Sequence, residues 1–141
     1  MEIEELKTIL EKNDYTLVVD RKGEIYTSYL KGVAPVLNPM KEDIHFFKDA
    51  IVVDRVVGKA AAMLFIKGHI QKVHTHIISL YACQMLEKYS IAYTYDECVD
   101  YIINRQGNGM CPMEETVLNI DDIDEAFIAL IKKQGELMNK K

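Results

Sequence analysis

The 141-residue chain lacks both a long apolar run and the paired cysteines of a disulfide framework. No stretch approaches the roughly 20 apolar residues that cross a bilayer, and the acidic start "MEIEELKTIL" is not typical of a secretion signal. Cys83, Cys98 and Cys111 form no CxxC pair, so we expect reduced thiols rather than disulfides. These absences predict a cytoplasmic protein that has no membrane partner.

An excess of positive charge is missing as well. The chain has 17 Lys and Arg against 22 Asp and Glu, a net charge of −5, so nonspecific electrostatics do not favour nucleic acid as a partner. Apolar residues make up 49% and charged residues 28% of the chain, which is ordinary for a globular protein. Because no repeat or linker divides the sequence, we predict one domain over residues 1–141.

The order of the expected elements predicts an α/β fold. A helix is expected in "EIEELKTILEK", then a β-hairpin formed by "YTLVVD" and "EIYTSY" around a turn at Gly23. A loop in "GVAPVLNP" and a helix in "KEDIHFFKDA" come next. The strand "IVV" is expected to lead into a helix that has Asp54 as its N-cap and runs to about Gly68.

Alternation of strands and helices continues in the second half of the chain. We expect a strand in "KVHTHIIS", a helix in "LYACQMLEKYS", a short strand in "IAYTY" and a helix in "DECVDYIIN". Pro112 suits the first turn of a further helix, and "DDIDEAFIALIKK" forms the last one. A hairpin followed by strand–helix units indicates a mixed sheet, with an antiparallel pair and then parallel strands.

The segment "DRVVGKAAA" combines a glycine inside an expected helix with two basic residues. It is not a P-loop, because the first glycine and the final Ser or Thr of that motif are absent. Gly58 and the following alanines give a smooth helix face that suits close packing with the sheet, a partner helix or a ligand. Arg55 and Lys59 are expected on one helical turn, where an anion would relieve their repulsion. A carboxylate of the protein itself, such as that of Asp54 or Glu114, would relieve this repulsion equally well without a ligand.

The segment "NRQGNGMCPME", residues 104–114, allows two interpretations. Cys111 is expected at a helix N-cap, where backbone N–H groups favour the thiolate, and Glu114 falls where a capping residue belongs. In the first interpretation this is a connector with an inert cysteine. In the second, Asn104, Arg105 and Cys111 line a pocket.

Two histidines alternate on an expected strand. His74 and His76 would therefore point to the same face, but zinc needs at least a third ligand, and no HxE or CxxC motif supplies one. We predict no metal and no cofactor, and we attribute the pair to the polar face of an edge or half-exposed strand.

The motifs D-x-V-x-G-K-A-A-A and N-R-x-G-x-G-x-C-P-x-E, with the segment "IISLYACQMLEKYSI", resemble a bacterial family known as domain of unknown function 1893. The resemblance implies a cytidine-deaminase-like fold, a three-layer α/β/α sandwich. It does not imply deaminase activity, because the HxE or CxE and PCxxC motifs that bind zinc are absent. It does imply a pocket between the N-termini of two helices. We expect this pocket to be surrounded by Asp54, Arg55, Lys59, Ser79, Asn104, Arg105, Cys111 and Glu114.

Three functions fit these residues. The first is a binding module for an anionic, nucleotide-like small molecule, held by Arg55, Lys59, Ser79, Asn104 and Arg105. The second is an enzyme that uses Cys111 as a nucleophile or redox thiol and Glu114 or Asp54 as a proton carrier. The third is a purely structural protein, such as a homodimer packed on the smooth face of residues 58–62.

Overall fold

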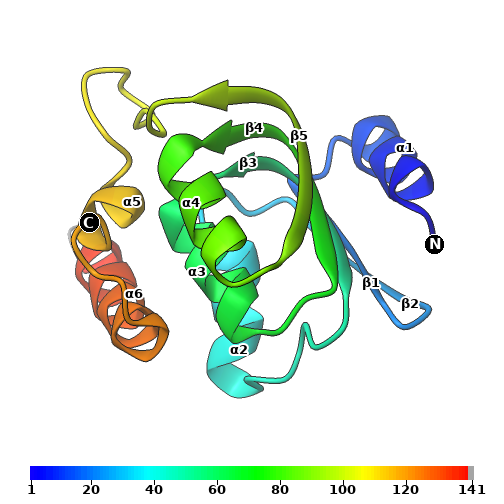
Figure 1. Cartoon of the computed structure of the whole chain (residues 1–141), viewed down its shortest axis with the longest axis horizontal. Coiled ribbons are helices and arrows are strands. Elements are labelled where there is room, and N and C mark those ends of the chain that lie inside the picture. Colours follow the sequence, from blue (N-terminus) through cyan, green and yellow to red (C-terminus); the bar gives the residue numbers. More distant parts are fainter. Residues whose placement is uncertain (140–141) are drawn as a thin grey trace.

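A computed structural model describes residues 1–139 as a five-stranded sheet with helices on both faces (Figure 1). The strands are β1 (Leu17–Arg21), β2 (Glu24–Ser28), β3 (Ile51–Val57), β4 (Lys72–Ser79) and β5 (Ala92–Val99), in the spatial order β2-β1-β3-β4-β5. β1 pairs antiparallel with β2 and β3, whereas β3, β4 and β5 run parallel. The predicted mixed sheet, with its hairpin first and its parallel strands later, is therefore confirmed.

The helices divide unequally between the two faces of the sheet. α1 (Ile3–Asn13) covers one face, and α2 (Ala34–Glu42), α3 (Lys59–Lys67) and α4 (Leu80–Lys88) cover the other (Figure 1). α5 (Pro112–Thr116) and α6 (Ile123–Met138) pack against the outer side of α3. α3 thus lies between the sheet and an outer helical layer, and every residue from Lys59 to Ile66 is buried.

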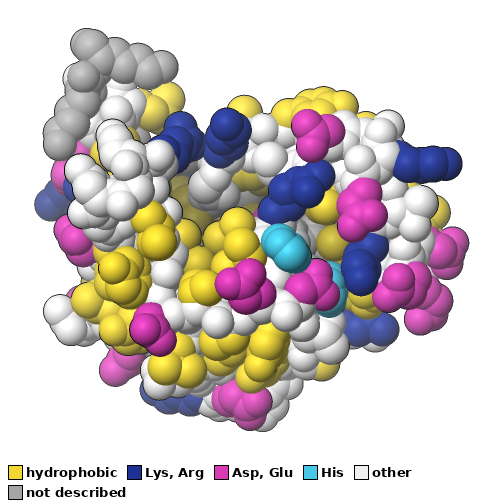
Figure 2. All heavy atoms as spheres, turned by 90° about the horizontal axis from the view of Figure 1, so that it is seen from above, with side chains coloured by type: hydrophobic (Ala, Val, Ile, Leu, Met, Phe, Trp, Pro, Cys, Tyr) yellow, Lys and Arg dark blue, Asp and Glu magenta, His cyan; other side chains and the backbone are white. Residues whose placement is uncertain are grey.

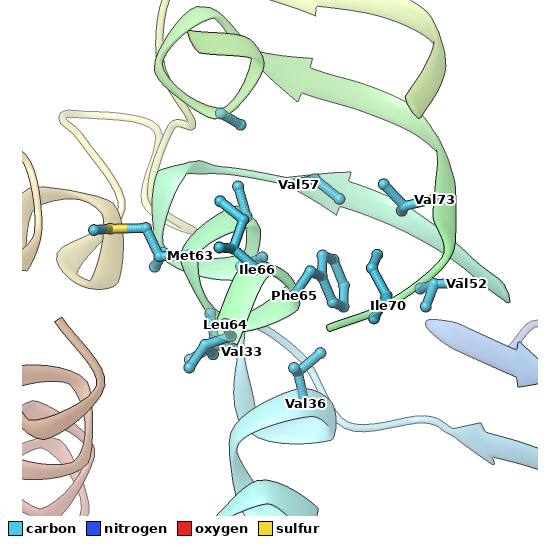
Figure 3. Close-up of a cluster of buried hydrophobic side chains, with 14 of the residues drawn as sticks. Val33, Val36, Val52, Val57, Met63, Leu64, Phe65, Ile66, Ile70 and Val73 are labelled. Carbon is cyan, nitrogen blue, oxygen red and sulfur yellow. The ribbon is translucent and has the colours of Figure 1, made fainter. Parts of the chain in front are cut away.

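Two apolar clusters hold these layers together. The larger one joins α2, α3 and α4 to the sheet, with Phe65 and Ile70 packed beside Val52 and Val73 (Figure 3). The smaller one consists of Leu6, Leu10, Val18 and Val53 and seats α1 on the opposite face. Alternate residues of β1 enter different clusters, as the two-residue period of a strand buried on both faces requires.

The smooth face of α3 is covered by the chain itself. Ala60, Ala61 and Ala62 are 2%, 6% and 0% exposed, because the sheet, α4 and the outer layer approach α3 closely. The small residues therefore serve internal packing, and this face is not available to a second copy. A homodimer remains a prediction, but it would have to use another surface.

Three element predictions were wrong. The expected loop at residues 32–39 contains most of α2, whereas residues 44–49 form turns instead of the expected helix. Residues 54–57 extend β3, so α3 begins only at Lys59 and its N-cap is Gly58, not Asp54. β5 runs on to Val99 through half of the segment expected to be helical, and Ile103 then pairs with Met110 in an isolated bridge.

Candidate functional site

The starts of α3 and α4 lie side by side at one edge of the sheet. β3 and β4 are parallel and adjacent, with Val57 opposite Ile78, and each strand leads directly into its helix. Gly58 is the N-cap of α3, and Ser79 is the N-cap of α4, where its hydroxyl oxygen accepts a hydrogen bond from the backbone N–H of Ala82 at 3.1 Å. The first backbone N–H groups of both helices, which have no partner within their own helix, and the positive ends of both helix dipoles therefore face the same region.

The side chain of Glu114 occupies this region. Its Oε2 accepts hydrogen bonds from the Lys59 backbone N–H at 2.6 Å and from the Ser79 hydroxyl at 2.7 Å, and its Oε1 accepts one from the Ile102 backbone N–H at 2.6 Å. Glu114 is 1% exposed. A buried carboxylate needs such donors, and two helix N-termini add favourable electrostatics. The protein thus supplies its own anion at this place.

Gly58 makes this close approach possible. A Cβ at residue 58 would lie 2.7 Å from Glu114 Oε2 and 3.0 Å from Ile102 Cγ1. The backbone of Gly58 is extended, with φ of −96°, so the conformation itself does not require glycine. The requirement is steric, because the carboxylate packs directly against the Cα.

The side chain of Lys59 points away from the carboxylate that its backbone binds. Lys59 is 4% exposed, and its Nζ donates to the Leu118 carbonyl at 3.0 Å and to Asp121 Oδ1 at 3.3 Å. The ammonium group therefore anchors the segment between α5 and α6. The expected convergence of Lys59, Ser79 and Glu114 is present, but it joins parts of the chain to one another.

Asp54 and Arg55 lie elsewhere. Both belong to β3, so the prediction that Arg55 shares a helical turn with Lys59 was wrong. Arg55 Nε donates to the Tyr15 carbonyl at 2.7 Å, and its Nη2 lies 3.3 Å from the Leu10 carbonyl oxygen and 3.4 Å from Asp14 Oδ1. The guanidinium therefore closes the C-terminal end of α1, where carbonyl oxygens lack helical partners.

The loop that carries the pocket residues Asn104 and Arg105 is held largely by its own contacts. The Asn104 side-chain amide donates to Asn108 Oδ1 at 2.9 Å and accepts from the Asn108 backbone N–H at 3.2 Å. Arg105 borders a groove between α2 and α6, away from the residues around Glu114. The structure therefore does not bring its guanidinium to the start of α3.

Cys111 is the N-cap of α5, as predicted, but α5 has only five residues. The cysteine is partly buried and packs against the larger core cluster. Its backbone N–H donates to the Ile102 carbonyl at 2.7 Å, which places Glu114 next to the N–H of the same Ile102. A cysteine-dependent enzyme remains a prediction from sequence. Asp54, one of its proposed proton carriers, borders a different cavity.

A second polar cluster lies between α1 and the sheet, around a cavity of about 180 Å³. We call it the α1 cavity; it is lined by Lys7, Leu10, Glu11, Val53, Asp54, Arg55, His74, His76 and Asp96. His74 and His76 do share a face, as predicted, but β4 is an interior strand of the sheet and not an edge. Burial raises the pKa of Asp54 to about 7, against the effect of hydrogen bonds from the backbone of Arg55 and Val56.

The contacts of the two histidines centre on Asp96 of β5. His76 Nδ1 lies 3.1 Å from Asp96 Oδ2, and His74 Nε2 lies 3.7 Å from Asp96 Oδ1. The hydrogen bond from His76 lowers the pKa of Asp96, and burial lowers that of His74. Within residues 1–139, no three His, Cys, Asp or Glu side chains are arranged to hold a metal ion. Asp96 was not among the predicted site residues, although the two-residue spacing of Thr94 and Asp96 matches that of the histidines in the parallel strand.

The groove beside Arg105 is larger, about 900 Å³. We call it the α2–α6 groove; its lining residues are Tyr26, Leu30, Ala34, Asn38, Pro39, Lys41, Glu42, Asp43, Phe46, Arg105, Gln134, Leu137 and Met138. Figure 2 shows one face of the molecule, on which a hollow with apolar side chains at its base and basic side chains at its rim is visible.

These features define a mixed α/β protein in which a buried carboxylate links two helix N-termini. A family model described as domain of unknown function (DUF1893) matches residues 5–133, so the chain belongs to this family. The predicted family resemblance is thereby confirmed. The crystal structure of a DUF1893 family protein (TM1506) from Thermotoga maritima is similar, with a TM-score of 0.84 and 30% identity over 94% of this chain and 92% of that chain. The comparison with curated proteins gives no match, and no described helix is long and apolar enough to span a membrane.

Proposed function

We propose that this protein is a binding module for a small anionic molecule with an apolar, planar body, and that the ligand occupies the α2–α6 groove. The observation that carries the proposal is the position of Arg105 on the wall of this groove. Because Glu114 already fills the anion position at the helix N-termini, the proposed site moves from there to the groove.

The size and lining of the groove support this function. Its volume of about 900 Å³ lies within the range of about 300–1,000 Å³ that small-molecule sites span. Tyr26 and Phe46, whose rings meet edge to face at 5.2 Å, provide an aromatic surface together with Pro39. A planar ring system would gain contact area on such a surface without ordering flexible side chains.

The polar groups of the groove are few and partly fixed in place. Gln134 accepts a hydrogen bond from Lys41 Nζ at 2.7 Å and donates one to Asn38 Oδ1 at 2.8 Å. Lys41 and Arg105 provide positive charge for a phosphate or carboxylate, and Arg105 can bind it with two parallel N–H groups. Glu42 and Asp43 also line the groove, so a ligand of high negative charge would be disfavoured.

A cytidine-deaminase-like fold is part of the same proposal. It is supported by two helices that follow parallel strands and start side by side, which is where zinc deaminases place their metal ligands. In this chain those starts carry Gly58, Lys59 and Ser79, which are not zinc ligands. The proposed function therefore has no zinc-activated water.

A ligand screen tests the proposal. Nucleoside monophosphates, sugar phosphates and aromatic carboxylates are added to the protein and the melting temperature is recorded, since a ligand at about 100 times its Kd stabilises the folded state by about 2.7 kcal/mol. Calorimetry then compares the wild type with Arg105→Ala. We expect affinity for the best ligand to fall at least about tenfold.

Lys132→Ala is the matched control, because Lys132 is exposed on α6 and does not line the groove. This variant should bind like the wild type. If none of these anions binds, or if Arg105→Ala retains full affinity, the proposed function is wrong.

A further inference from the structure

Within the part of the chain that the structure describes, the α1 cavity is lined by a buried nitrogen atom that has no hydrogen-bond partner. The His74 side chain is 9% exposed, and its Nδ1 lies 2.7 Å from Thr94 Oγ1. Its Nε2 has no hydrogen-bond partner among residues 1–139, and its ion-pair contact with Asp96 Oδ1 is 3.7 Å long. Buried polar atoms in native proteins are nearly always paired, so this nitrogen indicates a missing partner within the cavity.

We propose that the α1 cavity is a second binding site, separate from the α2–α6 groove, and that its ligand is a small free α-amino acid. The ammonium group of the ligand would lie between His74 Nε2 and Asp96 Oδ1. Its carboxylate would face the basic side of the cavity, formed by Lys7 and Arg55.

The geometry around His74 suits an ammonium group. When the ring donates from Nδ1 to Thr94 Oγ1, Nε2 presents a lone pair. The 3.7 Å between Nε2 and Asp96 Oδ1 is too long for a direct hydrogen bond, yet one ammonium group can donate to both atoms. Burial also lowers the pKa of His74, which keeps the ring neutral and able to accept.

The charges of the cavity wall suit a ligand that carries both signs. Asp96, Asp54 and Glu11 are acidic and Lys7 and Arg55 are basic, so a simple anion would meet as much repulsion as attraction. Arg55 already bonds the end of α1. Within the described part of the chain, Lys7 has only Glu4 as an ion-pair partner, at 3.6 Å, and the Glu4 side chain is 83% exposed. The ammonium group of Lys7 therefore has N–H groups available to a ligand.

The cavity volume limits the size of the amino acid. At about 30 Å³ for each water molecule, a cavity of about 180 Å³ corresponds to about six waters. Leu10 and Val53 provide apolar contacts for a small aliphatic side chain. Alanine, serine and valine are therefore the probes of choice.

The test uses ligands that differ by one charged group. Calorimetry compares L-alanine with propionate, which lacks the amine, and with ethylamine, which lacks the carboxylate. We expect alanine to bind at least about tenfold more tightly than either analogue. Asp96→Asn should reduce binding of alanine and of ethylamine, whereas Lys7→Gln should reduce binding of alanine and leave ethylamine unchanged. Lys12→Gln is the control, since Lys12 is exposed on the same helix and lies outside the cavity.

A second measurement does not depend on variants. Nitrogen-15 spectra of the four histidine rings in the wild-type protein should show a shift of His74 Nε2 when alanine is added, while His45 and His69 stay unchanged. The inference is overturned if no small amino acid binds, if propionate or ethylamine binds as tightly as alanine, or if bound alanine leaves His74 Nε2 unshifted. None of these results bears on the α2–α6 groove, so the two proposals can fail separately.

Discussion

The contact between Gly58 and Glu114 depends on the absence of a single carbon atom. A Cβ on residue 58 would come within 2.7 Å of Glu114 Oε2, in a carboxylate group that three donors hold in place. We therefore expect Gly58→Ala to lower the free energy of unfolding by about 1–3 kcal/mol, the usual effect of overpacking. Urea denaturation followed by circular dichroism measures this change.

Gly135 provides the matched control. It lies in the interior of α6, and a Cβ there would meet no atom within 4 Å. Gly135→Ala should therefore raise the free energy of unfolding by about 0.5–1 kcal/mol through helix propensity. Equal effects of the two substitutions would contradict a steric role for Gly58.

Asp54 makes the free energy of unfolding fall as the pH rises, which is the opposite of the usual effect of a carboxylate. Burial raises its pKa from 3.8 to about 7, so between these values the folded state holds a proton that the unfolded state has released. Stability contributed by Asp54 is thus lost as the pH rises through this window. Asparagine does not titrate, so the free energy of unfolding of Asp54→Asn should rise relative to that of the wild type between pH 5 and pH 8. We expect this relative gain to be about 1–2 kcal/mol, because Asp54 is only partly buried as a residue. Urea denaturation of both proteins at the two pH values gives this difference, and a constant difference would contradict it.

Sequence alone could predict which residues meet at the helix starts, but only in part. Lys59, Ser79 and Glu114 do converge, because two adjacent parallel strands place the following helices side by side. The prediction that Arg105 joins them failed because Asn104 and Asn108 fix the loop through their own hydrogen bonds. These hydrogen bonds are local to the loop, and the residue types alone do not determine where the folded loop then places Arg105.

At the scale of elements, α2 forms despite two prolines. Pro35 lies in the first turn, where its missing N–H costs nothing, but Pro39 lies within the helix and cannot donate to the carbonyl of Pro35. The hydroxyl of Tyr26 donates to that carbonyl instead, at 2.8 Å. A residue of β2 thus replaces the lost helical hydrogen bond. This long-range contact explains why the local sequence pattern predicted a loop.

Tyr26→Phe tests this replacement. The ring would keep its edge contact with Phe46, while the Pro35 carbonyl would lose its donor, so we expect the free energy of unfolding to fall by about 1–2 kcal/mol. The control is Tyr93→Phe, because the Tyr93 hydroxyl donates to the exposed Glu87 at 2.8 Å, which should be worth less than about 1 kcal/mol. Denaturant unfolding of both variants gives the comparison, and an equal cost would count against a structural role for the Tyr26 hydroxyl.

The segment after β5 shows a second limit of local patterns. Val99, Ile102 and Ile103 recur at helical spacing in the sequence, yet they are β-branched and fit strands equally well. Pairing with β4 up to the Ser79–Val99 register extends the sheet. The Ile102 N–H then bonds Glu114. Here the partner strand and a distant carboxylate decide the conformation.

At the scale of the whole molecule, the chain from α5 through α6 forms an outer layer that depends on α3. Glu114 ties α5 to the starts of α3 and α4, and Lys59 ties the segment after α5 to α3. Lys67, at the other end of α3, pairs with Asp124 at 2.6 Å and lies over the Phe127 ring. Two lysines of one helix thus hold the same layer, one buried and one near the surface.

Because Lys59 is more deeply buried than Lys67, we expect its substitution to lower the free energy of unfolding by more. Lys59→Met removes a buried ammonium group and leaves the partly buried Leu118 carbonyl without its donor, so we expect a loss of about 1–3 kcal/mol, together with faster amide exchange in α5 and α6. Lys67→Met removes a pair whose Asp124 partner is 80% exposed, which should cost less than about 1 kcal/mol. Hydrogen exchange read by mass spectrometry, with α1 on the opposite face of the sheet as the internal reference, measures both effects. The backbone N–H of residue 59 still binds Glu114 in Lys59→Met, so faster exchange in α4 as well as in α5 and α6 would contradict the assignment of this lysine to the outer layer alone.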